Sequence, residues 1–465
     1  MKEYDAIVIG SGGGAKIVQG LAKLGQRVAL VEEGRTGGTC LNKGCIPSKM
    51  LIHPAGMAAK IRALRKLHID AETKSVDFEA LIASINHYTD TTSGKLTDNF
   101  QQAENVDYYA GTARFTANNV VAVADDSLTA ETIVIATGSR PAIPDIPGLA
   151  DVPYMTSEHA LRNRKLPHRL IVLGGGYIAA ELGGAYANLG SEVTFILRST
   201  FLRREDTEII KEFEKVFRGG KTIHAHTRVA AVGYDQGVFR VSCRGGDNTP
   251  FEVEADALLV ATGVTPNADQ LGLENTGIKR DDSGFIAVDD YLQTSVPGVY
   301  AMGDVAGNYL FRHSVNFEAE YWLGTRYLAD QPHPIVYPPM PSAVFTHPEI
   351  ASVGSSESTL RQRGVDPVVA VARYPSCAMA VARGLDHGLV KLLFDRDKGQ
   401  LLGAHIVGEE ASTLIQELVL AMTAKLTAHD MYRQVYIHPA FPEVVRNALR
   451  TALLELDPDK AICFG

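Results

Sequence analysis

The chain has 465 residues, with 45 Lys and Arg against 54 Asp and Glu, so its formal net charge is −9. A chain of this length usually forms about three domains. A hydrophobic fraction of 45% and a charged fraction of 21% exclude a disordered, collagen-like or coiled-coil chain. The acidic balance argues against a nucleic-acid surface, and no run of 18 apolar residues marks a membrane span. Because no signal peptide precedes the first strand and the five cysteines are too few for a secreted disulfide framework, we expect a cytoplasmic protein with no nucleic-acid or membrane partner.

A glycine-rich turn lies between a strand and a helix near the start of the chain. A continuous apolar run at 6–9 leads into glycines and Ala15 at 10–15, then a helical pattern to about residue 24 and a second apolar run that ends at Glu32. Continuous apolar strands are typical of a parallel sheet buried on both faces. Glycines let the backbone approach a pyrophosphate, and a carboxylate at position 32 can bind an adenosine ribose. The pattern predicts a nucleotide-binding unit, and the alternative is a tight turn without a ligand.

The same order recurs from a strand at 170–173 through glycines at 174–176, a helix and a strand at 193–197. The copies are too far apart for a solenoid repeat, so a second nucleotide-binding unit is indicated. Here the acidic residue is missing, and Arg198, Arg203 and Arg204 follow the strand. Arginine matches a 2′-phosphate, whereas a carboxylate would repel it, so the segment predicts NADP. A solvated basic loop is the alternative.

Apolar strands also lead into Ala-Thr-Gly at 136–138 and 261–263, and into Gly-Asp at 303–304. Proline clusters at 141–147 and 332–341 mark linkers. Mixed strands and then long helical segments follow the second cluster. We therefore predict an α/β chain with two Rossmann-like nucleotide-binding domains and an α+β C-terminal domain.

Cys40 and Cys45 are separated by four residues within the segment GGTCLNKGCIPSKM at 37–50. No second close Cys or His pair completes a zinc site, so no metal site is predicted. Lys49 and the start of the following helix favour a thiolate, and a close pair in a cytosolic chain is more often catalytic than structural. These features favour a reducible disulfide over two unpaired thiols.

Together these motifs resemble those of the flavoprotein disulfide reductases (class I pyridine nucleotide-disulfide oxidoreductases). That family includes dihydrolipoamide dehydrogenase, glutathione reductase, mycothione reductase and mercuric reductase. The resemblance covers nearly the whole chain and ends with His438-Pro439 and Glu443 in the family's order. It implies the following domains: a first part of an FAD-binding domain at 1–148, an NAD(P)H-binding domain at 149–266, a second part of the FAD-binding domain at 267–334, and an interface or dimerisation domain at 335–465.

The resemblance also implies which residues bind and react. FAD would be held by the first turn, the segments after it and the Gly-Asp motif, namely Gly10, Gly12, Gly14, Ala15, Glu32, Gly38, Thr39, Gly111, Ala113, Thr137, Gly138, Ser139, Gly303 and Asp304. The nicotinamide coenzyme would be held by Gly174, Gly176, Tyr177, Ile178, Ala179, Arg198, Arg203 and Gly263. The catalytic residues would be the redox pair, a lysine with its glutamate partner and a histidine–glutamate dyad, namely Cys40, Cys45, Lys49, Glu181, His438 and Glu443.

Two half-reactions are implied by the resemblance. The nicotinamide coenzyme reduces the flavin, and the flavin reduces the Cys40–Cys45 disulfide. Cys45 would lie next to the flavin, and Cys40 would attack the substrate disulfide. His438, oriented by Glu443 as in a triad, would exchange the proton and would come from the other subunit of a homodimer. Outside this pattern, such a histidine is more often structural.

The branches of the family differ at a few positions. The mercuric reductase pattern has a C-terminal vicinal cysteine pair, whereas Cys463 stands alone here. Dihydrolipoamide dehydrogenase shares the cysteine motif, but it normally carries an acidic residue at position 198 and glycine at position 179. The stretches at 310–319 and 437–449 are most similar to mycothione reductase.

We therefore predict an NADPH-driven reductase of a mycothione- or glutathione-like disulfide in cell redox homeostasis. The alternative is an NAD-dependent dihydrolipoamide dehydrogenase, with a lipoyl substrate. A scaffold subunit or a flavin-based redox sensor without turnover stays open. Cys243, Cys377 and Cys463 are interpreted as incidental thiols.

Overall fold

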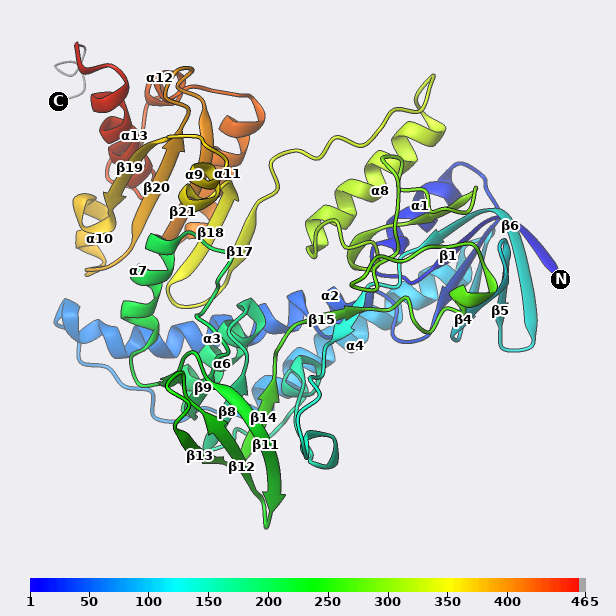
Figure 1. Ribbon diagram of the computed structural model, residues 1–465, viewed down its shortest axis with the longest axis horizontal. Coiled ribbons are helices and arrows are strands. Elements are labelled where there is room, and N and C mark those ends of the chain that lie inside the picture. Colours follow the sequence, from blue (N-terminus) through cyan, green and yellow to red (C-terminus); the bar gives the residue numbers. More distant parts are fainter. Residues whose placement is uncertain (460–465) are drawn as a thin grey trace. The chain divides into compact units, whose positions relative to one another are not determined.

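The computed structural model describes residues 1–459, and the chain forms two compact units. The first comprises residues 1–50, 80–143 and 263–336, and the second comprises residues 51–79, 144–262 and the chain from 337 onward. Each unit is therefore assembled from segments that are far apart in the sequence, as the colours in Figure 1 show. Among the described residues, no helix has both the length and the apolar character needed to cross a bilayer.

The first unit is built on a seven-stranded sheet of order β3-β2-β1-β6-β5-β4, with β16 also pairing with β6. The strands around β1 and β6 are parallel, and the β4–β5–β6 edge is an antiparallel meander. Residues 6–9 are buried, as their continuous apolar pattern predicts. The strands are β1 (Lys2–Ile9), β2 (Val28–Glu32), β3 (Val106–Ala110), β4 (Ala113–Ala117), β5 (Val120–Val123), β6 (Asp126–Ile135) and β16 (Val299–Ala301).

Helices α1 (Gly14–Lys23) and α8 (Arg312–Tyr327) pack against each other in this unit. A Cβ at Gly20 of α1 would lie 2.5 Å from the Leu323 side chain of α8, so a larger residue there would require Leu323 to move. The short helix α2 (Gly38–Asn42) follows β2. The unit is completed by β7 (Ser139–Pro141) paired with β15 (Val264–Pro266), and by parts of α3 (Cys45–Ala63) and α4 (Phe78–Gln102), which extend into both units.

The second unit contains the second glycine turn. A parallel sheet has the order β10-β9-β8-β14, beside an antiparallel sheet of order β11-β12-β13. Strand β9 begins and ends one residue earlier than the sequence predicts. The elements are β8 (Arg169–Leu173), α5 (Ser157–Ala160), α6 (Tyr177–Leu189), β9 (Glu192–Ile196), α7 (Thr207–Phe217), β10 (Thr222–His224), β11 (Arg228–Asp235), β12 (Val238–Arg244), β13 (Pro250–Ala255) and β14 (Ala257–Val260).

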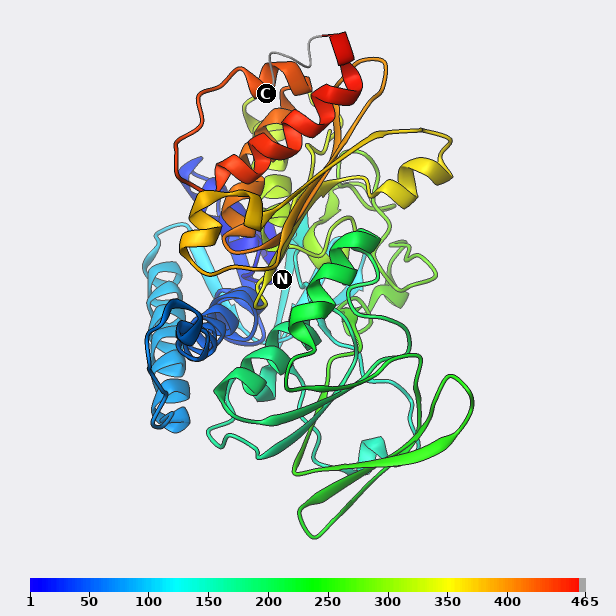
Figure 2. The same cartoon turned by 90° about the vertical axis from the view of Figure 1, so that its left-hand side faces the viewer.

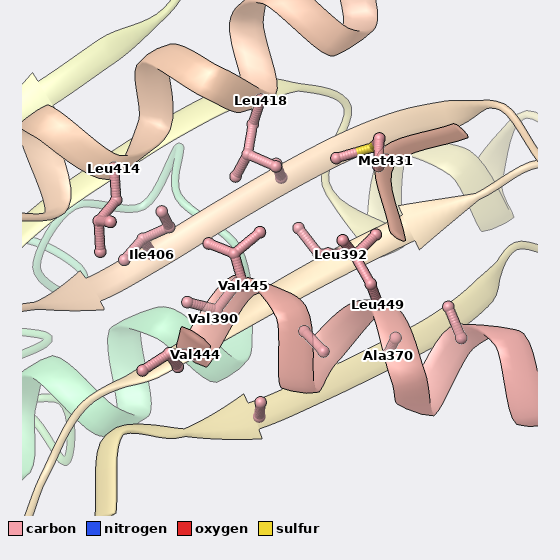
Figure 3. Close-up of a cluster of buried hydrophobic side chains, with 14 of the residues drawn as sticks. Ala370, Val390, Leu392, Ile406, Leu414, Leu418, Met431, Val444, Val445 and Leu449 are labelled. Carbon is pink, nitrogen blue, oxygen red and sulfur yellow. The ribbon is translucent and has the colours of Figure 1, made fainter. Parts of the chain in front are cut away.

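The C-terminal part of the second unit is an antiparallel sheet of order β17-β18-β21-β20-β19. Helix α13 lies along β19 and β20, with Val445 and Leu449 against Leu392, while Leu414 and Leu418 of α11 pack over Ile406 (Figures 2 and 3). The elements are β17 (Ser342–Val344), β18 (Glu349–Gly354), α9 (Glu357–Gln362), β19 (Val368–Arg373), α10 (Ala378–Ala382), β20 (Leu389–Phe394), β21 (Leu401–Gly408), α11 (Ala411–Thr423), α12 (Ala428–Tyr432) and α13 (Pro442–Leu456).

The predicted fold class is confirmed: two nucleotide-type sheets, one with an antiparallel edge and one fully parallel, precede an α+β C-terminal part. Most of the parallel strands are buried on both faces, and this burial explains their continuous apolar sequences. The domain boundaries at residues 148, 266 and 334 stay a prediction.

Candidate active site

The first glycine turn joins β1 to α1 in a conformation that needs glycine. Gly10 has a φ of +95°, and a Cβ there would lie 2.5 Å from the carbonyl oxygen of Ala136. A Cβ at Gly14 would lie 2.7 Å from Val8, so the close approach of helix to strand falls on Gly14, one residue before Ala15. The turn thus opens the N-terminus of α1 at the carboxyl edge of the sheet, where a pyrophosphate binds in Rossmann units.

Glu32 is fixed beside this turn at the end of β2. Its carboxylate accepts bonds from the Ser11 backbone N–H at 2.8 Å and from the Ser11 hydroxyl at 2.5 Å, and its other oxygen accepts from the Gly34 N–H at 2.9 Å. The Gly111 N–H donates to the Glu32 carbonyl at 2.9 Å, which places the turn before Ala113 beside the same strand end. The position fits a carboxylate that binds an adenosine ribose.

A buried aspartate lies at the Gly-Asp motif of the first unit. The Ser139 hydroxyl donates to Asp304 at 2.6 Å, and burial raises the pKa of Asp304. The Gly303 N–H donates to the fully buried Glu318 of α8 at 2.7 Å. The Ala-Thr-Gly segment is fixed nearby by the Thr137 hydroxyl, which donates to the Asn267 carbonyl at 3.0 Å. The role of Glu318 could not be predicted from the sequence, because a lone helical glutamate carries no local motif.

The predicted redox pair comes together at the junction of two helices. Cys40 lies in α2, Cys45 is the first residue of α3, and both are free thiols, the reduced form of the predicted disulfide. The Cys40 thiol donates to Cys45. This bond, supported by Lys49 and Arg312, overcomes burial and lowers the pKa of Cys45 to about 7. The same bond, with burial, raises the pKa of Cys40. Cys45 is therefore the better thiolate of the pair.

Arg312 is a site residue that sequence reasoning missed. It begins α8, and its Nη1 lies 4.0 Å from the position that a Cβ on Gly12 would occupy. A Cβ on Gly38 would lie 2.7 Å from the Gly12 Cα, so the glycine turn and the segment of Gly38 and Thr39 are in contact. A second cation is thus placed near the thiols. Nothing in the local sequence pairs residues so distant along the chain.

The second glycine turn repeats the backbone geometry of the first. Gly174 has a φ of +122°, and a Cβ there would lie 2.2 Å from the carbonyl oxygen of Ala261, as Gly10 meets Ala136. Gly176 precedes α6, whose first three residues are Tyr177, Ile178 and Ala179. Gly263 follows Ala261 and has a φ of +137°.

Three arginines lie after β9 where the first unit has its glutamate. Arg198, Arg203 and Arg204 are exposed, and in the part of the chain that the structure describes no carboxylate pairs with them. An exposed, unneutralised guanidinium fork is available to a phosphate.

Glu181 and Lys49 belong to different units. Glu181 is buried in α6 and accepts a bond from the Phe345 N–H at 2.9 Å, while the Lys49 ammonium lies 3.4 Å from the Ser48 hydroxyl. Their predicted pairing stays a prediction.

The predicted histidine–glutamate dyad is present in the second unit. His438 Nδ1 lies 2.8 Å from Glu443 Oε1, and the Ala440 N–H donates to the other oxygen at 3.1 Å. The hydrogen bond with His438 lowers the pKa of Glu443. The His438 side chain is 72% exposed. With Nδ1 engaged by the carboxylate, Nε2 is the nitrogen left for proton exchange with another group.

The remaining cysteines have no partner thiol nearby in the described chain. Cys243 is buried in β12, and burial raises its pKa to about 11. Cys377 is buried and donates to the Ala440 carbonyl at 3.3 Å. Cys463 lies outside the described residues.

The family models that match the chain agree with this arrangement. Residues 4–320 match the pyridine nucleotide-disulphide oxidoreductase family, and residues 340–449 match the dimerisation domain of pyridine nucleotide-disulphide oxidoreductases. The chain belongs to this family of flavoprotein disulfide reductases, which are oxidoreductases acting on sulfur groups.

Relatives of nearly full length are similar to the chain. Mycothione reductase of Mycobacterium tuberculosis is 38% identical, over 97% of this chain and 99% of that protein. Dihydrolipoyl dehydrogenase of Bacillus subtilis is 34% identical, over 97% of each. The structure of the HOCl-induced flavoprotein disulfide reductase RclA from Escherichia coli in its Cu(II) complex superposes with a TM-score of 0.87 at 28% identity, covering 97% of this chain and 99% of that one.

Membership of the family implies FAD and a pyridine nucleotide as cofactors. The residues of the first unit fit FAD: two glycine positions leave no room for a Cβ, a carboxylate ends β2, and a buried aspartate follows β16. The second glycine turn fits the dinucleotide coenzyme in the same way.

Proposed function

We propose that the chain is an NADPH-dependent reductase of a low-molecular-weight disulfide of the mycothione or glutathione kind. The observation that carries the choice of coenzyme is the set of exposed arginines after β9, Arg198, Arg203 and Arg204. In the first unit the carboxylate of Glu32 ends the equivalent strand, whereas its counterpart by register in the second unit is the apolar Leu197, directly before Arg198. A carboxylate would bind the ribose of NAD, whereas the guanidinium fork matches the additional phosphate of NADPH.

Bound FAD would supply the transfer of two electrons from the nicotinamide to the Cys40–Cys45 disulfide. The reduced pair then acts in sequence. A base removes the proton from Cys40, whose thiolate attacks one sulfur of the substrate, forming a mixed disulfide and releasing the first thiolate. Cys45 attacks the Cys40 sulfur, re-forms the internal disulfide and releases the second thiolate. The balance is one NADPH, one proton and one disulfide giving NADP⁺ and two thiols.

His438 supplies the proton exchange in this proposal. The hydrogen bond with Cys45 and burial raise the pKa of Cys40, so its attack requires a base, and the released thiolates require an acid. The bond between His438 Nδ1 and Glu443 orients the ring, so that Nε2 is left to exchange the proton. We propose that the dyad of each subunit acts on the thiol pair of the other subunit in a homodimer, in keeping with the matched dimerisation domain.

Dihydrolipoyl dehydrogenase activity is the second candidate. The similarity to the Bacillus subtilis enzyme and the cysteine segment at 37–50 favour it. This activity runs with NAD in that branch of the family, so the coenzyme separates the two candidates.

The decisive experiment is the ratio of kcat/KM for NADPH to that for NADH with a common disulfide acceptor. We expect a strong NADPH preference. Arg198→Glu with Arg203→Ala should lower the preference by at least about 10-fold, since the loss of one charge-assisted interaction already gives roughly that factor and this variant changes two arginines. Arg228→Glu, at an exposed position of β11, is the matched control. A strong NADH preference of the unaltered enzyme would refute the proposal and make lipoamide the leading substrate.

A further inference from the structure

The segment between β9 and α7, residues 197–206, is held at its C-terminal end by a buried polar cluster. We call this group the Lys391 cluster. It joins the last two residues of the segment to the C-terminal sheet and comprises Glu205, Asp206, Ser352, Glu357, Lys391 and His405.

Lys391 is the centre of this cluster. Its side chain is 4% exposed, and its ammonium lies 2.9 Å from Asp206 Oδ1, 2.7 Å from Glu357 Oε2 and 3.7 Å from Glu208 Oε2. Asp206 also caps α7, because its Oδ1 accepts from the Glu208 N–H at 3.0 Å while its Oδ2 accepts from the Glu357 N–H at 3.2 Å. A single buried cation thus fixes the residue at which the segment ends and α7 begins.

A second contact holds the preceding residue. The Ser352 hydroxyl of β18 lies 2.5 Å from Glu205 Oε2 and 3.1 Å from Nδ1 of His405 in β21, whose Nε2 lies 3.1 Å from the Ser355 carbonyl. Burial raises the pKa of Glu205 and lowers that of His405. Strands β18, β20 and β21 therefore each contribute a polar side chain to the anchor, and α7 packs beside β21 (Figure 1).

The middle of the segment contacts the second glycine turn. The Leu202 N–H donates to the Gly175 carbonyl at 2.8 Å, and a Cβ on Gly175 would lie 3.1 Å from the Thr200 carbonyl. Phe201 is fully buried and packs edge-on against Phe195 and Phe217. Arg203 and Arg204 are thus the only two residues between a contact with the turn and the buried anchor.

We infer that Lys391 is a positioning residue for coenzyme selection: through Asp206 it fixes the end of the segment, so that Arg203 and Arg204 are held where the 2′-phosphate of the coenzyme binds. This inference rests on the proposed function. A guanidinium recognises phosphate through a fork of fixed geometry, so a displaced backbone loses the recognition even with the arginines intact.

The test is Lys391→Met, with binding and kinetics measured on the FAD-loaded enzyme. The probes are adenosine 2′,5′-bisphosphate and 5′-AMP, which differ in the 2′-phosphate alone, and binding is measured by calorimetry. We expect the Kd of the bisphosphate and the KM of NADPH to rise about 5- to 20-fold. The Kd of 5′-AMP, the KM of NADH and kcat should change less than about twofold. Lys391→Arg should keep most of the affinity for the bisphosphate that Lys391→Met loses. Lys398→Met, at an exposed turn of the same sheet, is the matched control.

A second variant covers the case in which the buried acids, left without their cation, unfold the protein. Asp206→Asn with Lys391→Met removes both charges and keeps a side chain that can cap α7. The same selective loss of bisphosphate binding is expected. In a background of Arg203→Ala with Arg204→Ala, Lys391→Met should have no further effect on bisphosphate binding, because the groups it positions are gone.

The outcomes separate the two proposals. If the unaltered enzyme binds the bisphosphate no better than 5′-AMP, the proposed coenzyme is wrong. If it prefers the bisphosphate but Lys391→Met weakens both probes equally, or neither, the positioning role of Lys391 is overturned while the proposed function stands.

Discussion

A single shared proton gives the two cysteines different chemistry. The Cys40 thiol stays protonated and donates a hydrogen bond to Cys45. The cations Lys49 and Arg312 act on both sulfurs. Cys45 is thus about half thiolate at pH 7, whereas Cys40 stays protonated there; in the proposed reaction Cys40 therefore needs a base before it can attack. The difference in pKa between the two cysteines follows from one hydrogen bond and from burial, because the two residues are of the same type.

The first prediction tests that hydrogen bond. In Cys40→Ala the donor is lost, so the pKa of Cys45 should rise from about 7 towards that of an ordinary cysteine. In Cys40→Ser the hydroxyl can still donate, and the pKa should stay closer to its original value. The measurement is the pH dependence of Cys45 alkylation by iodoacetamide, located by mass spectrometry. Reactivity should disappear as the pH falls below the pKa, and buried Cys377 serves as an internal reference. Equal pKa values in both variants would contradict the assignment.

At the scale of elements, helix α11 carries a partly buried acid whose Oε1 is shielded from solvent. Glu417 lies on α11, its Oε2 is 3.4 Å from the Gln434 amide, and no hydrogen-bond partner among the described residues reaches its Oε1. Burial raises the pKa of Glu417 to about 7. The neighbouring Tyr436 precedes the dyad segment, so the acid lies close to the chain that carries His438.

The second prediction concerns stability. Because the pKa of Glu417 is higher in the folded state than in the unfolded state, the folded protein binds more protons between about pH 4.5 and 7, and its stability falls as the pH rises through that range. Glu417→Gln should therefore be more stable than the unaltered protein at pH 8, by about 1–3 kcal/mol, with no difference near pH 4. Thermal unfolding at the two pH values measures this, with Gln416→Glu as a control on the exposed face. An equal shift at both pH values would refute it.

The strands and glycine turns could be predicted because their signals are local. The runs at 6–9 and 170–173 are buried as their composition requires, and Gly10 and Gly174 occupy backbone conformations that favour glycine. The roles of Arg312 and Lys391 could not be predicted, since each depends on a contact between residues far apart in the chain. A lone arginine or lysine in a sequence is indistinguishable from a solvated one.

At the scale of the whole molecule, the chain carries every part of the proposed reaction, but the dyad and the thiol pair lie in different units. In our proposal the histidine comes from a second copy of the chain, and the matched dimerisation domain suggests such a homodimer. A two-fold dimer then contains two equivalent active sites, each built from both chains.

The third prediction tests this arrangement by mixing inactive variants. Cys40→Ser and His438→Ala should each abolish or strongly reduce disulfide reduction as homodimers. A hybrid dimer would contain one site with both defects and one intact site, so co-expression with random pairing should restore about a quarter of the original activity. Mixing folded homodimers without exchange is the control. No recovery in purified hybrid dimers would show that each site is formed within a single chain.

The matching backbones of the two glycine turns also have an evolutionary consequence. Gly10 against Ala136 and Gly174 against Ala261 are the same structural solution twice in one chain, as duplication of an ancestral unit would leave it. The copies differ near the end of the second strand: Glu32 ends β2 in one, and arginines follow β9 in the other. The choice between the two nucleotide ligands therefore depends on residues outside the shared backbone of the glycine turns. An ancestor could change coenzymes through a few surface substitutions without endangering its fold, and an engineer can follow the same short route.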